Sequence, residues 1–147
     1  MDLERVVELL RLSPHPEGGY YRETFRVSSS TAIYYLLPAG TFSAFHRVHM
    51  DEVWHYYDGD PLELHVVHAG GRHERVVLGR DLQNHERPQH IVPAGAWQAA
   101  APIGSRWSLC GCTVAPAFDF AQFEMPPRAE MLTILPGHDD LVRRFTR

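Results

Sequence analysis

The sequence predicts an all-β (mainly β) protein of the jelly-roll type, with a short helix before the strands and short helices after them. Many short segments rich in β-branched and aromatic residues are separated by Gly- and Pro-rich turns, which is typical of β-barrels and sandwiches. Apolar residues recur at helical spacing only near the two ends of the chain. At 147 residues, 44% of them hydrophobic, the chain suits one domain, residues 1–147, with a single core.

Helices are expected at the two ends. Residues 3–10 show helical spacing, with Asp2 placed to cap the helix and Ser13-Pro14 placed to stop it. Two more helices are expected at 128–135 and 138–145. The second of these has acidic residues in its first turn and arginines in its last, which complements the helix dipole.

Between the helices we expect strands separated by Gly and Pro turns. In chain order, they are expected at residues 20–25, 31–37, on both sides of a bend at 49–51, and then at 62–67, 75–78, 90–92 and 108–114.

The stretch 40–59, GTFSAFHRVHMDEVWHYYDG, is the centre of the functional hypothesis. His46 precedes Glu52 by six residues, and a bend between two short strands would bring the imidazole across from the carboxylate. Side chains alternate along a strand, so Glu52, Trp54 and Tyr56 share one face. A facing imidazole and carboxylate can ligate a metal or exchange a proton with a substrate. A second stretch, 93–98, reads as a turn and a strand that return the Gln98 amide to the same space.

Together these motifs resemble the two signatures of the cupin superfamily. The first contains Gly40, His46, Glu52 and Gly59, and the second is Pro93-x-Gly95-x-x-Gln98. The segments HPEGGYYRET at 15–24, EVWHYYDGDPLEL at 52–64, VPAGAWQAA at 92–100 and GCTVAPAFDF at 111–120 resemble its domain-of-unknown-function branch (Cupin_5 type). The resemblance implies a cupin double-stranded β-helix, close in fold to the dTDP-sugar epimerases, from about Leu3 to the C-terminus.

The sequence departs from the cupin pattern at two of the four usual ligand positions. Val48 stands where the second His of His-x-His is expected, and Gln98 stands where a His is usual. His49 is one residue out of phase with His46 and is expected to point away from it. His46, Glu52 and Gln98 could hold a divalent metal (Fe, Mn, Ni or Zn) with waters. They could equally form a hydrogen-bonding trio around a substrate.

Other residues keep two interpretations each. Trp54, Tyr56 and Tyr35 either fill the barrel or form the wall of a substrate-binding pocket. His55, on the opposite face from Glu52, is expected to be structural or to lie at a subunit contact. The remaining histidines, as in 72–74 and 84–86, are expected on the solvated surface.

Composition excludes several classes of function. All fourteen basic residues are Arg, so Schiff-base chemistry and lysine general bases are excluded. With a net charge of −4 and dispersed arginines, no nucleic-acid face is expected. No apolar run is long enough to cross a bilayer and the N-terminus carries acids, so we expect no membrane partner and a cytoplasmic protein. Cys110 and Cys112 are expected to be buried thiols in a reducing compartment.

Three functions are consistent with the sequence. The first is an isomerase, epimerase or lyase in which His46 and Glu52 move a proton while Gln98 fixes a small-molecule substrate. The second is a metal-dependent cupin enzyme such as an oxygenase, and the third is a non-catalytic protein that binds a small metabolite. Proteins with this resemblance pair through sheet edges, so a homodimer is expected.

Overall fold

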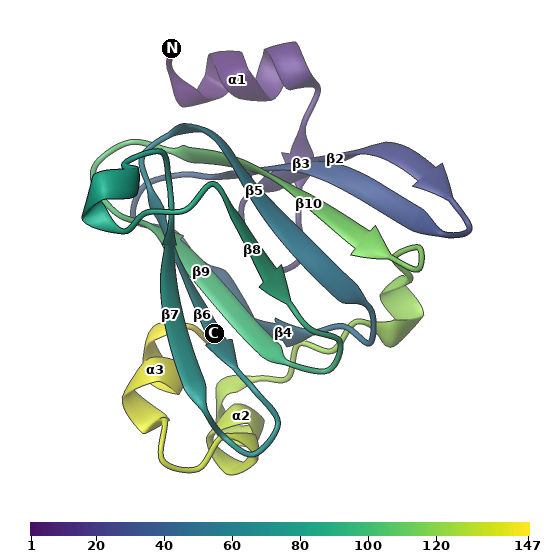
Figure 1. The fold of residues 1–147 in the computed structure, drawn as a ribbon, viewed down its shortest axis with the longest axis vertical. Coiled ribbons are helices and arrows are strands. Elements are labelled where there is room, and N and C mark those ends of the chain that lie inside the picture. Colours follow the sequence, from purple (N-terminus) through teal and green to yellow (C-terminus); the bar gives the residue numbers. More distant parts are fainter.

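The computed structural model describes all 147 residues and places ten strands in two antiparallel sheets (Figure 1). One sheet has the strand order β1-β2-β3-β10-β5-β8, and the other has the order β4-β9-β6-β7. The strands are β1 (Ser13–Pro14), β2 (Tyr20–Val27), β3 (Ser30–Leu37), β4 (Ser43–Arg47), β5 (Asp51–Gly59), β6 (Leu62–Val67), β7 (His73–Leu78), β8 (Gln89–Val92), β9 (Trp97–Pro102) and β10 (Ser108–Ala115).

The main core lies between the two sheets. Tyr35 and Trp54 from the six-stranded sheet pack with Leu64 and Val66 from the four-stranded one, and all four are essentially inaccessible to solvent. Cys110 and Cys112 are free and buried in the same core. Burial raises the pKa of the Cys110 thiol to about 12, so this group stays protonated at neutral pH.

Three helices complete the fold. α1 (Leu3–Leu10) covers part of the outer face of the six-stranded sheet, while α2 (Arg128–Ile134) and α3 (Asp139–Arg144) cover the outer face of the other sheet. The Asp2 side chain caps α1 by accepting from the Arg5 backbone N–H at 2.9 Å. Because the four-stranded sheet is covered on both faces, all six residues of β6 are buried.

The predicted elements and the observed ones agree in type and order, and the β-rich jelly roll with short terminal helices is confirmed. One difference lies after α1. The helix ends at Arg11, which adopts a left-handed conformation (φ 56°), and Ser13–Pro14 then forms β1 instead of only stopping the helix. No helix is both long enough and apolar enough to cross a bilayer.

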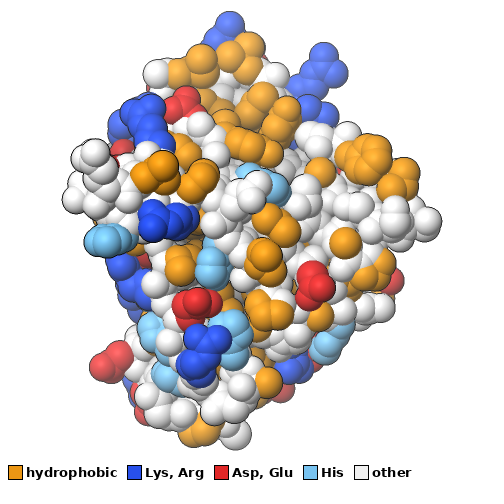
Figure 2. Space-filling view, viewed as in Figure 1, with side chains coloured by type: hydrophobic (Ala, Val, Ile, Leu, Met, Phe, Trp, Pro, Cys, Tyr) orange, Lys and Arg blue, Asp and Glu red, His pale blue; other side chains and the backbone are white.

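His73 and His85 are exposed, as expected for the segments 72–74 and 84–86, whereas His68 and His90 are half-buried in a polar cluster. On the face shown in Figure 2, histidine side chains gather near carboxylate and arginine groups. Glu74 Oε1 lies 3.2 Å from the Nε2 atoms of both His68 and His90. His73 stacks on the buried His65 ring, whose Nε2 lies 2.9 Å from Glu63 Oε1. The Glu74 contacts join β7 of the four-stranded sheet to β8 of the six-stranded sheet, and none of these residues lines the cavity between the sheets.

Candidate functional site

A cavity of about 300 Å³ opens between the two sheets at the end of the barrel where β4 turns into β5. β4 belongs to the four-stranded sheet and β5 to the six-stranded sheet, so His46 and Glu52 enter the cavity from different sheets. The cavity wall has a polar part and an apolar part. The polar part is formed by Ser13, His15, Glu17, Arg22, Glu23, Thr31, His46 and Glu52, and the apolar part by Tyr21, Ile33, Val48, Cys112, Val114, Phe118, Phe120 and Phe123.

Glu17 and His46 form a buried ion pair on the cavity wall. His46 Nδ1 lies 2.8 Å from Glu17 Oε2 and 2.8 Å from the Ala44 carbonyl oxygen, so Nδ1 carries a proton shared between two acceptors. The Ser43 hydroxyl donates to the same Glu17 oxygen at 2.6 Å.

The two pKa values describe a charged pair. Burial opposes the charged form of each group, yet the His46 charge and hydrogen bond bring the Glu17 pKa down to about 2, and the Glu17 charge and hydrogen bond bring the His46 pKa up to about 9. At neutral pH His46 is therefore an imidazolium whose Nε2–H is not used by the pair.

His15 is held as a neutral imidazole beside this pair. The Glu17 backbone N–H donates to His15 Nδ1 at 3.1 Å, so Nδ1 is an acceptor and the proton of the neutral ring is on Nε2. Burial, the largest effect, lowers the pKa of His15, and the charge of His46 lowers it further against the opposing effect of Glu17. The His15 ring packs edge-on against Tyr21 with centroids 4.4 Å apart.

Glu52 is held from behind by Gln98 and Trp54. Trp54 Nε1 donates to Gln98 Oε1 at 2.8 Å, and Gln98 Nε2 donates to Glu52 Oε1 at 2.7 Å. An indole N–H can only donate, so it fixes which end of the amide faces the carboxylate. Burial raises the pKa of Glu52; the charge of His46 opposes that rise and the charge of Glu17 adds to it.

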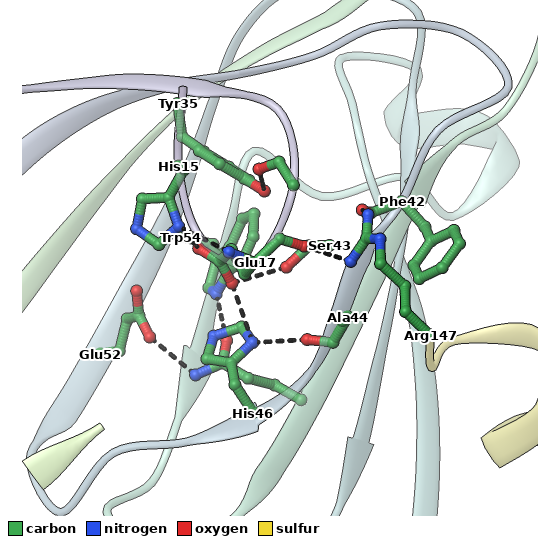
Figure 3. A network of polar contacts seen from close by, with 12 residues as sticks. His15, Glu17, Tyr35, Phe42, Ser43, Ala44, His46, Glu52, Trp54 and Arg147 are labelled. Atoms are coloured by element: carbon green, nitrogen blue, oxygen red, sulfur yellow. Dashed lines mark hydrogen bonds and ion pairs between the residues drawn. The ribbon is translucent and has the colours of Figure 1, made fainter. Parts of the chain in front are cut away.

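Three polar atoms of the cavity wall make no hydrogen bond to another nitrogen or oxygen atom of the protein: the donors His15 Nε2 and His46 Nε2 and the acceptor Glu52 Oε2. The Cys112 thiol is the further hydrogen-bond partner of the Glu52 carboxylate. No side-chain N or O atom of the protein is both fully enclosed and unpaired. Since all three residues line the cavity, these atoms are open to it. Figure 3 shows His15 and Glu52 on the same side of the Glu17–His46 pair, directed toward a common space.

The structure brings together His46 and Glu52, as expected, but places the other predicted residues behind or away from the cavity wall. Gln98 and Trp54 are fully buried behind Glu52. The Tyr35 hydroxyl donates to the Gly18 carbonyl at 2.6 Å, and the Tyr56 hydroxyl donates to the Gly59 carbonyl at 2.7 Å. These four side chains therefore support the site from behind or fill the barrel, and none of them lines the cavity.

Two further histidines lie as expected outside the cavity. His49 Nε2 lies 2.8 Å from Glu124 Oε2 on the surface, consistent with its being out of phase with His46. His55 lies on the opposite face of β5 from Glu52, with Nε2 3.0 Å from the Thr113 hydroxyl.

His15 and Glu17 were missed by the sequence reasoning as site residues. They lie in the loop between β1 and β2, and Glu17 reaches the cavity because Gly18 and Gly19 both take positive φ values, 115° and 72°. A Cβ at Gly18 would lie 2.2 Å from the Phe42 carbonyl oxygen, so only glycine lets the loop approach β4 this closely. The available signal was a His-Pro-Glu run directly before a glycine pair.

The residues at the expected ligand positions do not fit a divalent metal as they are arranged. The Gln98 carbonyl oxygen, its only ligating atom, is taken by Trp54, and the amide presents N–H to Glu52. His46 uses Nδ1–H toward Glu17 and carries a second proton at neutral pH. No three His, Cys, Asp or Glu side chains are grouped as a metal would require.

Several known proteins are similar to this chain over most of its length. The sequence matches the family model described as Cupin superfamily (DUF985) over residues 4–126. Protein SO0799 from Shewanella oneidensis is 33% identical with a TM-score of 0.95, over 100% of this chain and 98% of that chain. A hypothetical protein from Leishmania major is 30% identical with a TM-score of 0.93, over 99% of each chain.

Two other matches are more distant. The uncharacterized Saccharomyces cerevisiae protein YML079W is 26% identical, over 95% of this chain and 78% of that protein. Oxalate decarboxylase from Bacillus subtilis has a TM-score of 0.65 at 12% identity, over 90% of this chain and 36% of that chain. At such identity the likeness concerns the fold alone. These matches confirm the resemblance and the jelly roll predicted from the motifs.

Proposed function

Since the chain belongs to the Cupin superfamily (DUF985), whose fold here encloses a polar cavity, we propose that it is a proton-transfer enzyme of the isomerase, epimerase or lyase type acting on a small carbonyl compound. One observation carries the proposal. Two N–H donors, at His15 Nε2 and His46 Nε2, face the same cavity as a free carboxylate oxygen, Glu52 Oε2.

These three atoms have complementary roles in removing a proton next to a carbonyl group. Glu52 Oε2 takes the proton, and the electron pair of the broken C–H bond forms the C=C bond of an enolate. The negative charge that moves to the carbonyl oxygen is stabilised by the two imidazole N–H groups, which are fixed before the reaction begins. Return of the proton from Glu52 to a neighbouring carbon gives an isomer, and protonation of the opposite face of the enolate by a water molecule gives an epimer.

The pKa shifts suit these roles. The raised pKa of Glu52 makes its carboxylate a stronger base than an exposed glutamate. His15, with a lowered pKa, donates its hydrogen bond as a neutral ring, and His46, with a pKa of about 9, adds a positive charge near the developing oxyanion. In this proposal His46 stabilises charge and Glu52 moves the proton.

The test is exchange of carbon-bound hydrogen for deuterium. Wild-type protein is incubated in D₂O with a panel of small ketones and aldehydes, and loss of each α-proton signal is followed by ¹H NMR. We expect Glu52→Gln to slow exchange by about 10²–10⁴-fold. His55→Gln, on the opposite face of the same strand, is the matched control and should exchange at the wild-type rate. Exchange by Glu52→Gln at the wild-type rate would refute the proposal.

A further inference from the structure

One side of the cavity is an aromatic wall formed by Tyr21, Phe118, Phe120 and Phe123. The three phenylalanines, from the segment around the short 3₁₀ helix Phe120–Gln122, pack edge-on against one another with centroids 4.7 to 6.2 Å apart. Their apolar surface offers a contact for the apolar body of a ligand.

The aromatic wall lies directly beside the polar atoms of the site. Phe123 stacks on the His46 ring at 5.4 Å with an interplanar angle of 26°, and Phe120 and Phe123 both lie within 6.3 Å of the His15 ring. A ligand oxygen bonded to the two histidine N–H groups therefore has the rest of its molecule against Phe120 and Phe123.

Two cationic side chains line the cavity, Arg22 and His46, and both are engaged by other groups of the protein. Arg22 lies across from Tyr34 in the β2–β3 register, so its side chain is directed to the outer face of the sheet. Its Nε–H donates to the Leu10 carbonyl of α1 at 2.7 Å, and its guanidinium lies over the Tyr34 ring. The other positive group, His46, is balanced by the negative charge of Glu17, so this pair adds no net charge to the cavity.

The remaining cavity charge is negative. Glu23 is neutralised by Arg26, which contacts both of its carboxylate oxygens at 2.7 and 2.8 Å. Glu52 forms no ion pair: its hydrogen-bond partners are Gln98 and the Cys112 thiol, and the charge of His46 acts on it without direct contact. A fixed anionic group on a ligand would therefore meet an unpaired carboxylate in a buried site, where repulsion is little screened.

From this arrangement we infer that the site takes an uncharged cyclic or aromatic carbonyl compound, and not a phosphorylated or carboxylated metabolite. The inference rests on the proposed function for the position of the carbonyl oxygen. The ring lies against the aromatic wall, the oxygen lies between His15 and His46, and the acidic C–H bond faces Glu52.

Nitrophenyl compounds test this ligand class directly. 4-Nitrophenol places an oxygen that can carry a delocalised negative charge on a planar ring, as an enolate does, and its visible absorption reports ionisation in the bound state. We expect wild-type protein to bind 4-nitrophenol at least tenfold more tightly than 4-nitrophenyl phosphate or 4-nitrobenzoate, measured by titration calorimetry at pH 6, where 4-nitrophenol is almost entirely uncharged and the other two probes are anionic. Equal or tighter binding of either anionic probe, or no binding of 4-nitrophenol, would overturn the inference.

Two variants locate the binding. Phe120→Ala should weaken 4-nitrophenol binding at least threefold, whereas Leu82→Ala should not, although the two side chains are similarly exposed, at 48% and 58%. Unchanged affinity in Phe120→Ala would overturn the aromatic wall as the contact surface.

The Glu52→Gln variant separates this inference from the proposed function. Removal of the carboxylate should leave 4-nitrophenol affinity equal or higher and should reduce the discrimination against 4-nitrobenzoate. If 4-nitrophenol binds as expected but the deuterium exchange of bound ketones does not depend on Glu52, the ligand class stands and the proton-transfer proposal fails. If only anionic carbonyl compounds undergo Glu52-dependent exchange, the proton-transfer proposal stands and the ligand class fails.

Discussion

Replacing Glu17 by Gln tests whether the buried ion pair keeps His46 charged. The Gln side chain retains an oxygen that can accept from His46 Nδ1–H but removes the negative charge. In the wild-type protein the pKa of His46 rises from 6.5 to about 9 even though burial alone lowers it. A rise of that size corresponds to ~3 kcal/mol of preference for the protonated ring.

Without the Glu17 charge, burial dominates and the pKa of His46 should fall below 6.5. Because the folded-state pKa of His46 is raised, its contribution to wild-type stability is fully present below pH 6.5 and is lost as the pH rises through about 9. The depressed pKa of Glu17 adds stability that is present above pH 4.5 and is lost as the pH falls through about 2. At pH 7 we therefore expect Glu17→Gln to lower the free energy of unfolding by about 3–5 kcal/mol, the usual result of removing one partner of a buried pair.

Two measurements check these expectations. Urea unfolding between pH 5 and pH 10 gives the free energy of unfolding, and ¹⁵N NMR titration of labelled histidines gives the pKa of His46. Glu52→Gln is the control, because Glu52 makes a smaller contribution than Glu17 to the pKa of His46. If His46 in Glu17→Gln still titrates near 9, Glu17 is not the cause of the shift and the reasoning is wrong.

Two further substitutions probe how the site is supported. Gly18→Ala should destabilise the fold by at least ~2 kcal/mol, because a Cβ at this position would lie 2.2 Å from the Phe42 carbonyl oxygen and φ is 115°. Thermal unfolding measures this, and a variant that melts at the wild-type temperature would contradict the prediction. Trp54→Phe removes the donor to Gln98, so we expect the free energy of unfolding to fall by about 1–3 kcal/mol. Because the Gln98 hydrogen bond lowers the pKa of Glu52, we also expect the acidic limb in the pH profile of deuterium exchange to shift to higher pH. A pH profile that matches the wild type would show that Gln98 does not depend on Trp54 for its orientation.

The strands and helices could be predicted from the sequence because their signals are local. Alternation and Gly or Pro turns define strands such as β6, for which the predicted and observed bounds coincide at Leu62–Val67. The cap at Asp2 and the charges of α3 likewise lie within one or two turns of the helices they stabilise.

The site was only partly predictable because its contacts are not local. His46 and Glu52 carry the recognisable motif. Glu17 contacts Ser43, 26 residues away, and in the sequence it stands in a Pro-Glu-Gly-Gly run that is typical of an exposed turn. The face shared by Glu52, Trp54 and Tyr56 was predicted correctly, but β5 is long enough that Tyr56 lies beyond the cavity. Pairing into a homodimer stays a prediction.

The hydrogen-bonded chain from Trp54 through Gln98 to Glu52 also has an evolutionary consequence. Because the indole can only donate, the residue at position 54 determines which group position 98 presents to the carboxylate. A mutation at either position alone leaves a buried polar atom unsatisfied, so the two positions should be inherited as a pair. Among descendants of a common ancestor, a lineage that exchanges Gln98 for a metal-binding histidine would first, or at the same time, have to give up the tryptophan.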